Sequence, residues 1–132
     1  MTECVFCLVD SLEVIAENKL ALAFYDTCPV SNGHTLVIPK RHVETYFDAS
    51  PEEHRAISEL IFEVKALLEK KLSPAGYNIG ANIGQAAGQT VFHFHIHIIP
   101  RYSGDVDDPR GGLRKVISNR SPHLKSSKNA LH

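Results

Sequence analysis

Three histidines occupy alternate positions in the segment 92–99, with apolar residues between them. Side chains two residues apart on a β-strand point to the same face, so His93, His95 and His97 are expected to share one face. The opposite face would then take the apolar side chains Phe92, Phe94, Ile96 and Ile98. Imidazole serves as a nucleophile, a general acid or base, a phosphate partner or a metal ligand. The pattern therefore predicts a strand that packs with one face and carries chemistry on the other.

Length and composition indicate one cytoplasmic globular domain. The chain has 132 residues, of which 43% are hydrophobic, and this is enough for a packed core. The formal net charge is −1 and no basic stripe is present, which argues against a nucleic acid polymer as partner. No apolar run reaches the length of a membrane-spanning helix, and the N-terminus lacks the features of a secretory signal.

The order of predicted elements indicates an α+β fold. Apolar segments bounded by turn residues predict strands at 14–18, 20–25, 35–38, 77–83 and 91–99. One helix is predicted from Pro51 to about Leu72, because Ser50 is a good N-cap and Glu53 completes a capping box. A single helix covers only one face of such a sheet. The other face, or an edge strand, is expected to invite a second subunit.

A loop of small residues precedes the histidine strand and favours a phosphate site. Gly84 to Gly88 let backbone N–H groups approach an anion, and Gln89 and Thr90 add side-chain donors. A metal site built by the three histidines would want carboxylates, yet none lies between Glu69 and Asp105. That metal site and a plain polar edge strand remain the alternatives.

The segment 93–99 resembles the signature of the histidine-triad (HIT) superfamily, in which three histidines alternate with apolar residues. Further blocks resemble the family in the same order, at 22–26, 33–42, 82–84 and 87–91. The resemblance implies a HIT-like α+β fold that dimerises, with about five antiparallel strands, one long helix and a short one. We expect the HIT domain at residues 1–102. A C-terminal extension is expected at 103–132, as a partly ordered loop and then a flexible tail.

The resemblance also implies a role for each ring and a set of nucleotide contacts. His95 is the nucleophile that attacks the α-phosphate of a nucleotide conjugate, His97 hydrogen-bonds the phosphate or the leaving group, and His34 supports the nucleophile's ring. The implied nucleotide contacts are Asp26 on the ribose, Gln89 and Thr90 on phosphate oxygens, Asn82 on the phosphate or ribose, and Phe6, Val9 and Phe24 around the base. The alternative is an ordinary turn residue for Asp26 and Asn82, and an ordinary core residue for the three residues around the base.

Two cysteines and two histidines match the zinc ligands of some branches of the superfamily. These residues are Cys4, Cys7, His42 and His93. Four protein ligands with no open position suit a closed, structural zinc site. The alternatives are a redox-active cysteine pair or two free thiols. No organic cofactor is expected.

These features predict an enzyme that hydrolyses or transfers a nucleotide conjugate through a nucleotidyl-histidine intermediate, on diadenosine polyphosphates or other AMP conjugates. The extension at 104–116 carries Arg110 and Arg114, which are hypothesised to bind distal phosphates. The chain has no Trp, so the phosphoramidate preference of the branch that ends in a Trp-containing segment is not implied. The alternatives are a purine nucleotide-binding module that acts as a sensor or partner subunit, and a zinc enzyme.

Overall fold

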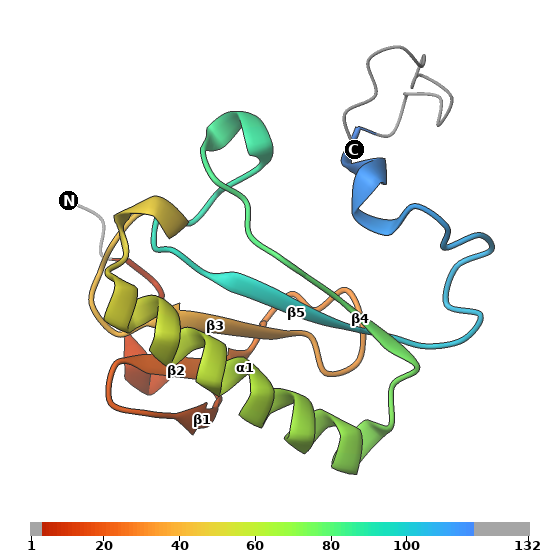
Figure 1. Ribbon diagram of the computed structural model, residues 1–132, viewed down its shortest axis with the longest axis horizontal. Helices are drawn as coiled ribbons and strands as arrows, with labels where there is room; N and C mark the ends of the chain where they lie inside the picture. Colours follow the sequence, from red (N-terminus) through yellow and green to blue (C-terminus); the bar gives the residue numbers. More distant parts are fainter. Residues whose placement is uncertain (1–3, 118–132) are drawn as a thin grey trace.

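The computed structural model describes residues 4–117, and its strands form one antiparallel sheet in the order β1-β2-β3-β5-β4 (Figure 1). The strands are β1 (Val14–Glu17), β2 (Ala21–Tyr25), β3 (Thr35–Pro39), β4 (Gly76–Gly80) and β5 (Ile96–Arg101). Within the described residues, the one α-helix is α1 (Pro51–Leu72), and the short helices are 3-10 turns. The α+β prediction is confirmed. The end of the predicted extension, residues 118–132, lies outside the described residues.

Local signals set both ends of α1, as the sequence predicts. The Ser50 hydroxyl accepts a hydrogen bond from the Glu53 backbone N–H at 3.1 Å, and the Glu53 carboxylate accepts one from the Ser50 backbone N–H at 2.9 Å. This capping box satisfies N–H groups that have no partner within the helix. The helix ends at Leu72, because Ser73 adopts a left-handed conformation with φ of 50°.

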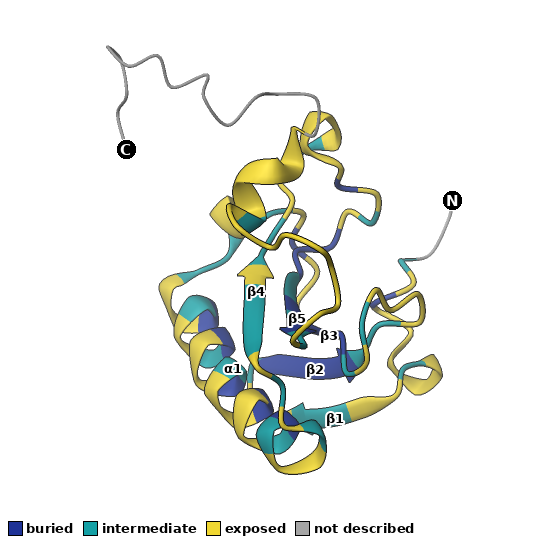
Figure 2. Cartoon of the chain, turned by 90° about the vertical axis from the view of Figure 1, so that its right-hand side faces the viewer, coloured by how far each residue is buried: buried dark blue, intermediate teal, exposed yellow. Residues whose placement is uncertain are grey.

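The sheet separates two apolar layers, and alternate residues of β2 face each one. Ala21 and Ala23 face α1, whose buried stripe lies against the sheet (Figure 2). Leu22 and Phe24 face the opposite layer, where Phe6 of the N-terminal segment covers them. Leu36 and Ile38 of β3 belong to the same layer, and Cys4 and Leu12 of the N-terminal segment pack against it.

The histidine strand is shorter than predicted. β5 begins at Ile96, so His93 and His95 precede the strand and only His97 lies within it. The partner strand explains this start. Ile96 pairs with Val37, but two residues farther along β3 stands Pro39, which has no N–H to donate.

The two-faced pattern nevertheless holds around the histidines, with one exception. Phe94 and Ile98 are buried in the layer under α1, while the ring of His95 contacts Phe6 on the other face. Phe92 was expected to pack with the apolar set, but it is 42% exposed. It stands outside the strand ladder and belongs to neither apolar layer, so the prediction for Phe92 is wrong.

Candidate functional site

His93 directs one ring nitrogen into a cluster of sulfur and nitrogen ligands. Its Nε2 donates to the carbonyl oxygen of Pro39 at 2.9 Å, which leaves the lone pair on Nδ1. That Nδ1 lies 3.5 Å from the Sγ atoms of Cys4 and Cys7. The Cys7 Sγ is in turn 3.4 Å from Nδ1 of His42. The structure thus brings together all four residues that the resemblance matched to a zinc site.

The spacing of these four ligand atoms fits a tetrahedral metal ion. All four lie within 4.8 Å of one another. With Zn–S near 2.3 Å and Zn–N near 2.0 Å, a tetrahedral ion separates a sulfur from a nitrogen ligand by about 3.6 Å. The observed separations of 3.4–3.5 Å agree with that value. Burial and the neighbouring Cys4 thiol raise the pKa of Cys7, which disfavours a reactive thiolate pair unless a cation is present.

His95 presents a lone pair on its Nε2 atom. Its Nδ1 donates to the carbonyl oxygen of His93 at 2.7 Å, so the neutral ring carries its proton on that side. Burial lowers the pKa of His95, which favours the neutral ring. The ring of Phe6 packs edge-on against it with centroids 5.0 Å apart. A neutral, fixed imidazole with a free Nε2 is suited to nucleophilic attack.

His97 has the opposite arrangement, and His34 imposes it. The backbone N–H of Val30 donates to Nδ1 of His34 at 3.1 Å, so the proton of His34 must lie on Nε2. The same Nε2 lies 2.9 Å from Nδ1 of His97 and donates to it. His97 therefore carries its own proton on Nε2. His34 was expected to support the nucleophile's ring, but the structure pairs it with His97.

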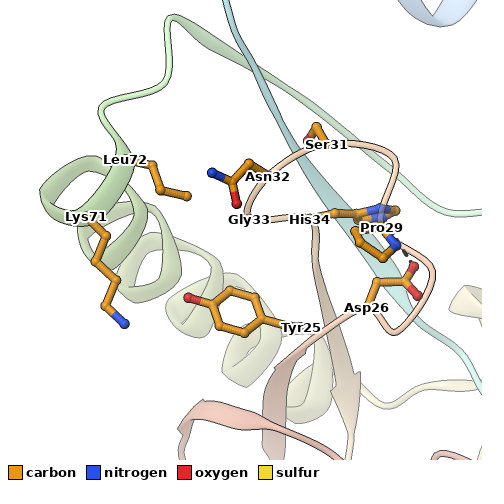
Figure 3. Close-up of a pocket in the computed structure, with 9 residues that line it drawn as sticks. All are labelled: Tyr25, Asp26, Pro29, Ser31, Asn32, Gly33, His34, Lys71 and Leu72. Atoms are coloured by element: carbon orange, nitrogen blue, oxygen red, sulfur yellow. Dashed lines mark ion pairs between the residues drawn. The ribbon is translucent and has the colours of Figure 1, made fainter.

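Burial and the neighbouring groups Asp26 and His95 affect the protonation of His34 and His97. The Asp26 carboxylate lies 3.5 Å from Nε2 of His34, as the dashed line in Figure 3 marks. Burial, together with the neighbouring His95 and His34, lowers the pKa of His97 to about 4. Burial also lowers the pKa of His34, although Asp26 opposes this. Both rings are therefore neutral near pH 7.

A glycine allows the chain to place His34 at the end of its loop. Gly33 has φ of +92°, a conformation that disfavours other residues. A Cβ atom at this position would also lie 2.7 Å from Cδ1 of Leu72 at the end of α1. Glycine at position 33 thus meets both a backbone requirement and a packing requirement, directly before His34.

Two cavities meet at His34. One, of about 310 Å³, lies between the loop that follows β2 and the end of α1, with Asp26 and His34 on its wall (Figure 3). The other, of about 410 Å³, opens beside His97. Asn82 lines this second cavity with five apolar side chains, Val30, Ala81, Ile99, Leu113 and Val116. The start of the predicted C-terminal extension therefore contributes to the site.

The structure does not bring all the predicted phosphate contacts together. The Gln89 side chain is buried within its own loop, where it donates to the carbonyl oxygens of Glu44 and Val91 and accepts from the Gly84 N–H. It therefore holds the loop in shape. Thr90 and Asn82 are exposed. Arg110 forms an ion pair with Asp108, and neither Arg110 nor Arg114 lines the two cavities described.

The three residues predicted to surround the base also lie in different environments. Phe6 and Phe24 pack together with ring centroids 5.3 Å apart. Phe24 is almost fully buried, so Phe6 presents the nearer aromatic surface to His95. Val9 is 45% exposed in the 3-10 turn Val9–Ser11, outside the apolar layer that holds the two rings.

Sequence reasoning missed the backbone groups that fix the rings. The carbonyl groups of Pro39 and His93 and the N–H of Val30 determine which nitrogen carries the proton in each ring. Any residue type can supply such a group, so the sequence gives no signal for them.

Among residues 4–117, none of the helices combines the length and apolar character needed to cross a membrane.

Comparison with known proteins places this geometry in one family. The HIT domain model matches residues 9–104. An uncharacterised HIT-like protein of Methanocaldococcus jannaschii is 46% identical over 120 residues, which are 86% of this chain and 91% of that protein. The crystal structure of a zinc-bound histidine triad family protein from Mycobacterium smegmatis aligns with a TM-score of 0.71 and 38% identity, over 78% of each chain.

Two relatives carry names that state an activity. An adenylylsulfatase of Arabidopsis thaliana is 36% identical over 107 residues, which are 78% of this chain. An asymmetrical bis(5'-nucleosyl)-tetraphosphatase of Schizosaccharomyces pombe is 40% identical over 96 residues, which are 73% of this chain. The chain spans about half of the length of these two relatives, 54% and 53% respectively.

Proposed function

This chain belongs to the HIT domain family, and on that premise we propose that it hydrolyses or transfers AMP conjugates through a covalent nucleotidyl-histidine intermediate. The observation that supports the proposal most is the hydrogen bond from Nδ1 of His95 to the His93 carbonyl, which leaves the Nε2 lone pair free. Diadenosine polyphosphates and adenylyl sulfate are the candidate substrates, in line with the activities for which two relatives are named.

In this proposal each ring acts through the nitrogen that it leaves free. His95 attacks the α-phosphorus with Nε2, and the His93 carbonyl stabilises the positive charge that then develops on the ring. His97 donates a hydrogen bond from Nε2 to a phosphate oxygen, where negative charge increases in the transition state. His34 is a positioning residue, because it acts only through Nδ1 of His97.

The remaining predicted contacts are kept as part of this proposal. We assign the ribose to Asp26, the phosphate or ribose to Asn82 and Thr90, and the base to the side of His95 that Phe6 covers. Val9 and Phe24 would complete the base pocket. The role of Gln89 is to hold the phosphate loop, since its side chain already bonds to three backbone groups. The protein would act as a homodimer on purine nucleotides.

The proposed cofactor is a structural zinc ion. Cys4, Cys7, His42 and His93 would hold it, and a zinc ion with four protein ligands supplies a rigid cross-link rather than an open position for chemistry. Phe6 lies between the two cysteines in the chain and its ring contacts that of His95. The cross-link would therefore hold the base-binding wall against the nucleophile.

The proposal is tested by trapping the covalent intermediate. Diadenosine tetraphosphate mixed with excess enzyme and analysed by intact-mass spectrometry, without acid, should show an adenylyl adduct that maps to His95. His95→Asn should lose the adduct and at least about 10⁴-fold of turnover. His54→Asn is the matched control, because His54 contacts Tyr46 near the start of α1 and should retain both. AMP binding without any adduct would instead indicate a nucleotide-binding module.

A further inference from the structure

The turn that leads into His34 is one of two forms open to its backbone. Residues 31–34 form a β-turn, in which the His34 backbone N–H donates to the Ser31 carbonyl oxygen at 3.2 Å. Its third residue, Gly33, has φ of +92°, whereas φ of Asn32 is not positive. This combination is characteristic of a type II turn. Rotation of the peptide between Asn32 and Gly33 would convert the turn to type I, whose third residue has a negative φ.

The choice between the two forms depends on support from outside the turn. Gly33 has no Cβ atom and adopts either sign of φ readily, so its own backbone does not decide. The Asn32 carbonyl belongs to the peptide that would rotate, and it accepts a hydrogen bond from the Tyr102 hydroxyl at 2.7 Å. The carbonyl groups on either side accept from residues close in the chain, whereas Tyr102 stands 70 residues farther along. The Tyr102 hydroxyl therefore favours the type II form.

Tyr102 is itself held by a compact turn at the end of β5. The Arg101 guanidinium donates to both oxygens of the Asp105 carboxylate, at 2.8 and 2.7 Å, and to Oδ1 of Asn78 at 2.7 Å. The same carboxylate accepts from the Tyr102 backbone N–H at 3.0 Å. Burial raises the pKa of the Tyr102 phenol, so the phenol keeps the proton that it donates.

The segment after β5 reaches the site at a second place. Two apolar side chains of the 3-10 turn Gly112–Val116 line the cavity beside His97. A Cβ atom on Gly112 would lie 3.4 Å from Nδ2 of Asn78, whose Oδ1 accepts from Arg101. Asn78 thus contacts both ends of the segment, which is anchored to the sheet where it begins and again where it lines the cavity.

We propose that Tyr102 is a positioning residue, whose hydroxyl holds the turn 31–34 in its type II form and thereby keeps the His34 ring in contact with His97. The Val30 N–H precedes this turn and donates to the ring of His34, which follows the rotating peptide. Rotation of that peptide would move the ring relative to Val30 and weaken its hydrogen bonds to Val30 and His97. For its effect on turnover, the inference rests on the proposed function.

The first measurement is independent of any activity. Tyr102→Phe removes one hydroxyl, and amide hydrogen exchange of Val30 should accelerate about 3- to 10-fold as its contact with the ring weakens. The residual dipolar coupling of the Gly33 N–H bond should move toward the value of the rotated peptide. Tyr77→Phe is the matched control, since its hydroxyl donates to the Glu69 carboxylate at 2.9 Å, and both quantities should stay at their wild-type values. Unchanged exchange of the Val30 amide in Tyr102→Phe would overturn the inference.

The second measurement tests whether the hydroxyl acts through His34. Tyr102→Phe should lower kcat for diadenosine tetraphosphate about 3- to 10-fold, with KM within about twofold of the wild type. In a His34→Ala background the same change should alter kcat less than about twofold, because the ring that the turn positions is gone. Wild-type kcat in Tyr102→Phe, or losses that multiply in the double variant, would overturn the inference alone. A wild-type protein without turnover would overturn the proposed function, and exchange of the Val30 amide would still decide the inference.

Discussion

The two ends of the histidine row hold similar sets of ligand atoms in different spacings. Around His93, sulfur and nitrogen atoms lie 3.4–3.5 Å apart. Around His97, the nitrogen of His34 lies at 2.9 Å and a proton occupies the contact. The first set has the spacing of a tetrahedral metal site, whereas in the second His34 already donates a hydrogen bond to His97. The role of each ring therefore depends on the partner of its second nitrogen.

A variant at the His93 end should lose zinc, and a variant at the His97 end should keep it. Cys4→Ala removes one of four ligands and should weaken zinc binding at least about 100-fold, so the purified protein should lose its zinc. His97→Ala should retain about one equivalent, because its nitrogens lie outside the closed site. Elemental analysis checks both, with Cys28→Ala as the matched thiol control. Zinc that follows His97 rather than Cys4 would reverse the two assignments.

The next effect concerns turnover and tests the other end. His34→Ala removes the donor that fixes the proton of His97 on Nε2, and kcat for diadenosine tetraphosphate should fall about 10- to 100-fold. His34→Gln can place an amide N–H near the same position and should recover part of that loss. The zinc content of both variants should equal that of the wild type. Full kcat in His34→Ala would show that His97 needs no partner.

A smaller effect tests the residue that connects the two clusters. Phe6→Leu should weaken AMP binding about 3- to 10-fold, because the edge-on contact with His95 is lost. Isothermal titration calorimetry measures this change, and zinc should remain bound. Phe62→Leu is the matched control, since that ring is 74% exposed on α1. Equal affinities for Phe6→Leu and the wild type would place the base elsewhere.

The smallest expected effect concerns stability in acid. Burial lowers the pKa of His97 to about 4, below the ordinary value of 6.5. Between these values the unfolded chain binds a proton that the folded chain does not, so stability falls as the pH drops from 6.5 to 4. The contribution of His97 is on the order of 1 kcal/mol after allowance for its partial exposure. Urea unfolding across this range should show a shallower fall in His97→Asn, and an unchanged slope would contradict the assignment.

Local signals in the sequence predicted part of this structure well. The capping box of Ser50 and Glu53 predicted the start of α1 correctly, because all of its atoms belong to residues close in the chain. The four zinc-site residues followed only from family resemblance, since His42 and His93 are far apart in the sequence. The start of β5 depends on Pro39, which lies in a different strand. The sequence pattern around the histidines therefore could not predict where β5 begins.

The sequence could not predict which ring nitrogens carry protons either, because this also depends on groups from other parts of the chain. Three backbone groups select the nitrogen that stays free in each ring, and a backbone group has no residue identity. Gln89 was predicted as a phosphate donor from its residue type and position. In the structure its amide instead satisfies backbone groups on both sides of its loop, which depends on where Glu44 passes.

Nitrogen NMR of the rings measures directly which nitrogen carries the proton in each histidine. Two-bond proton–nitrogen spectra of ¹⁵N-histidine-labelled protein at pH 7 distinguish the two neutral tautomers from the cation. We expect His95 with its proton on Nδ1, His97 and His34 with theirs on Nε2, and His93 with its proton on Nε2 and Nδ1 available to zinc. A His95 protonated on Nε2, or a His97 cation at pH 7, would contradict this expectation.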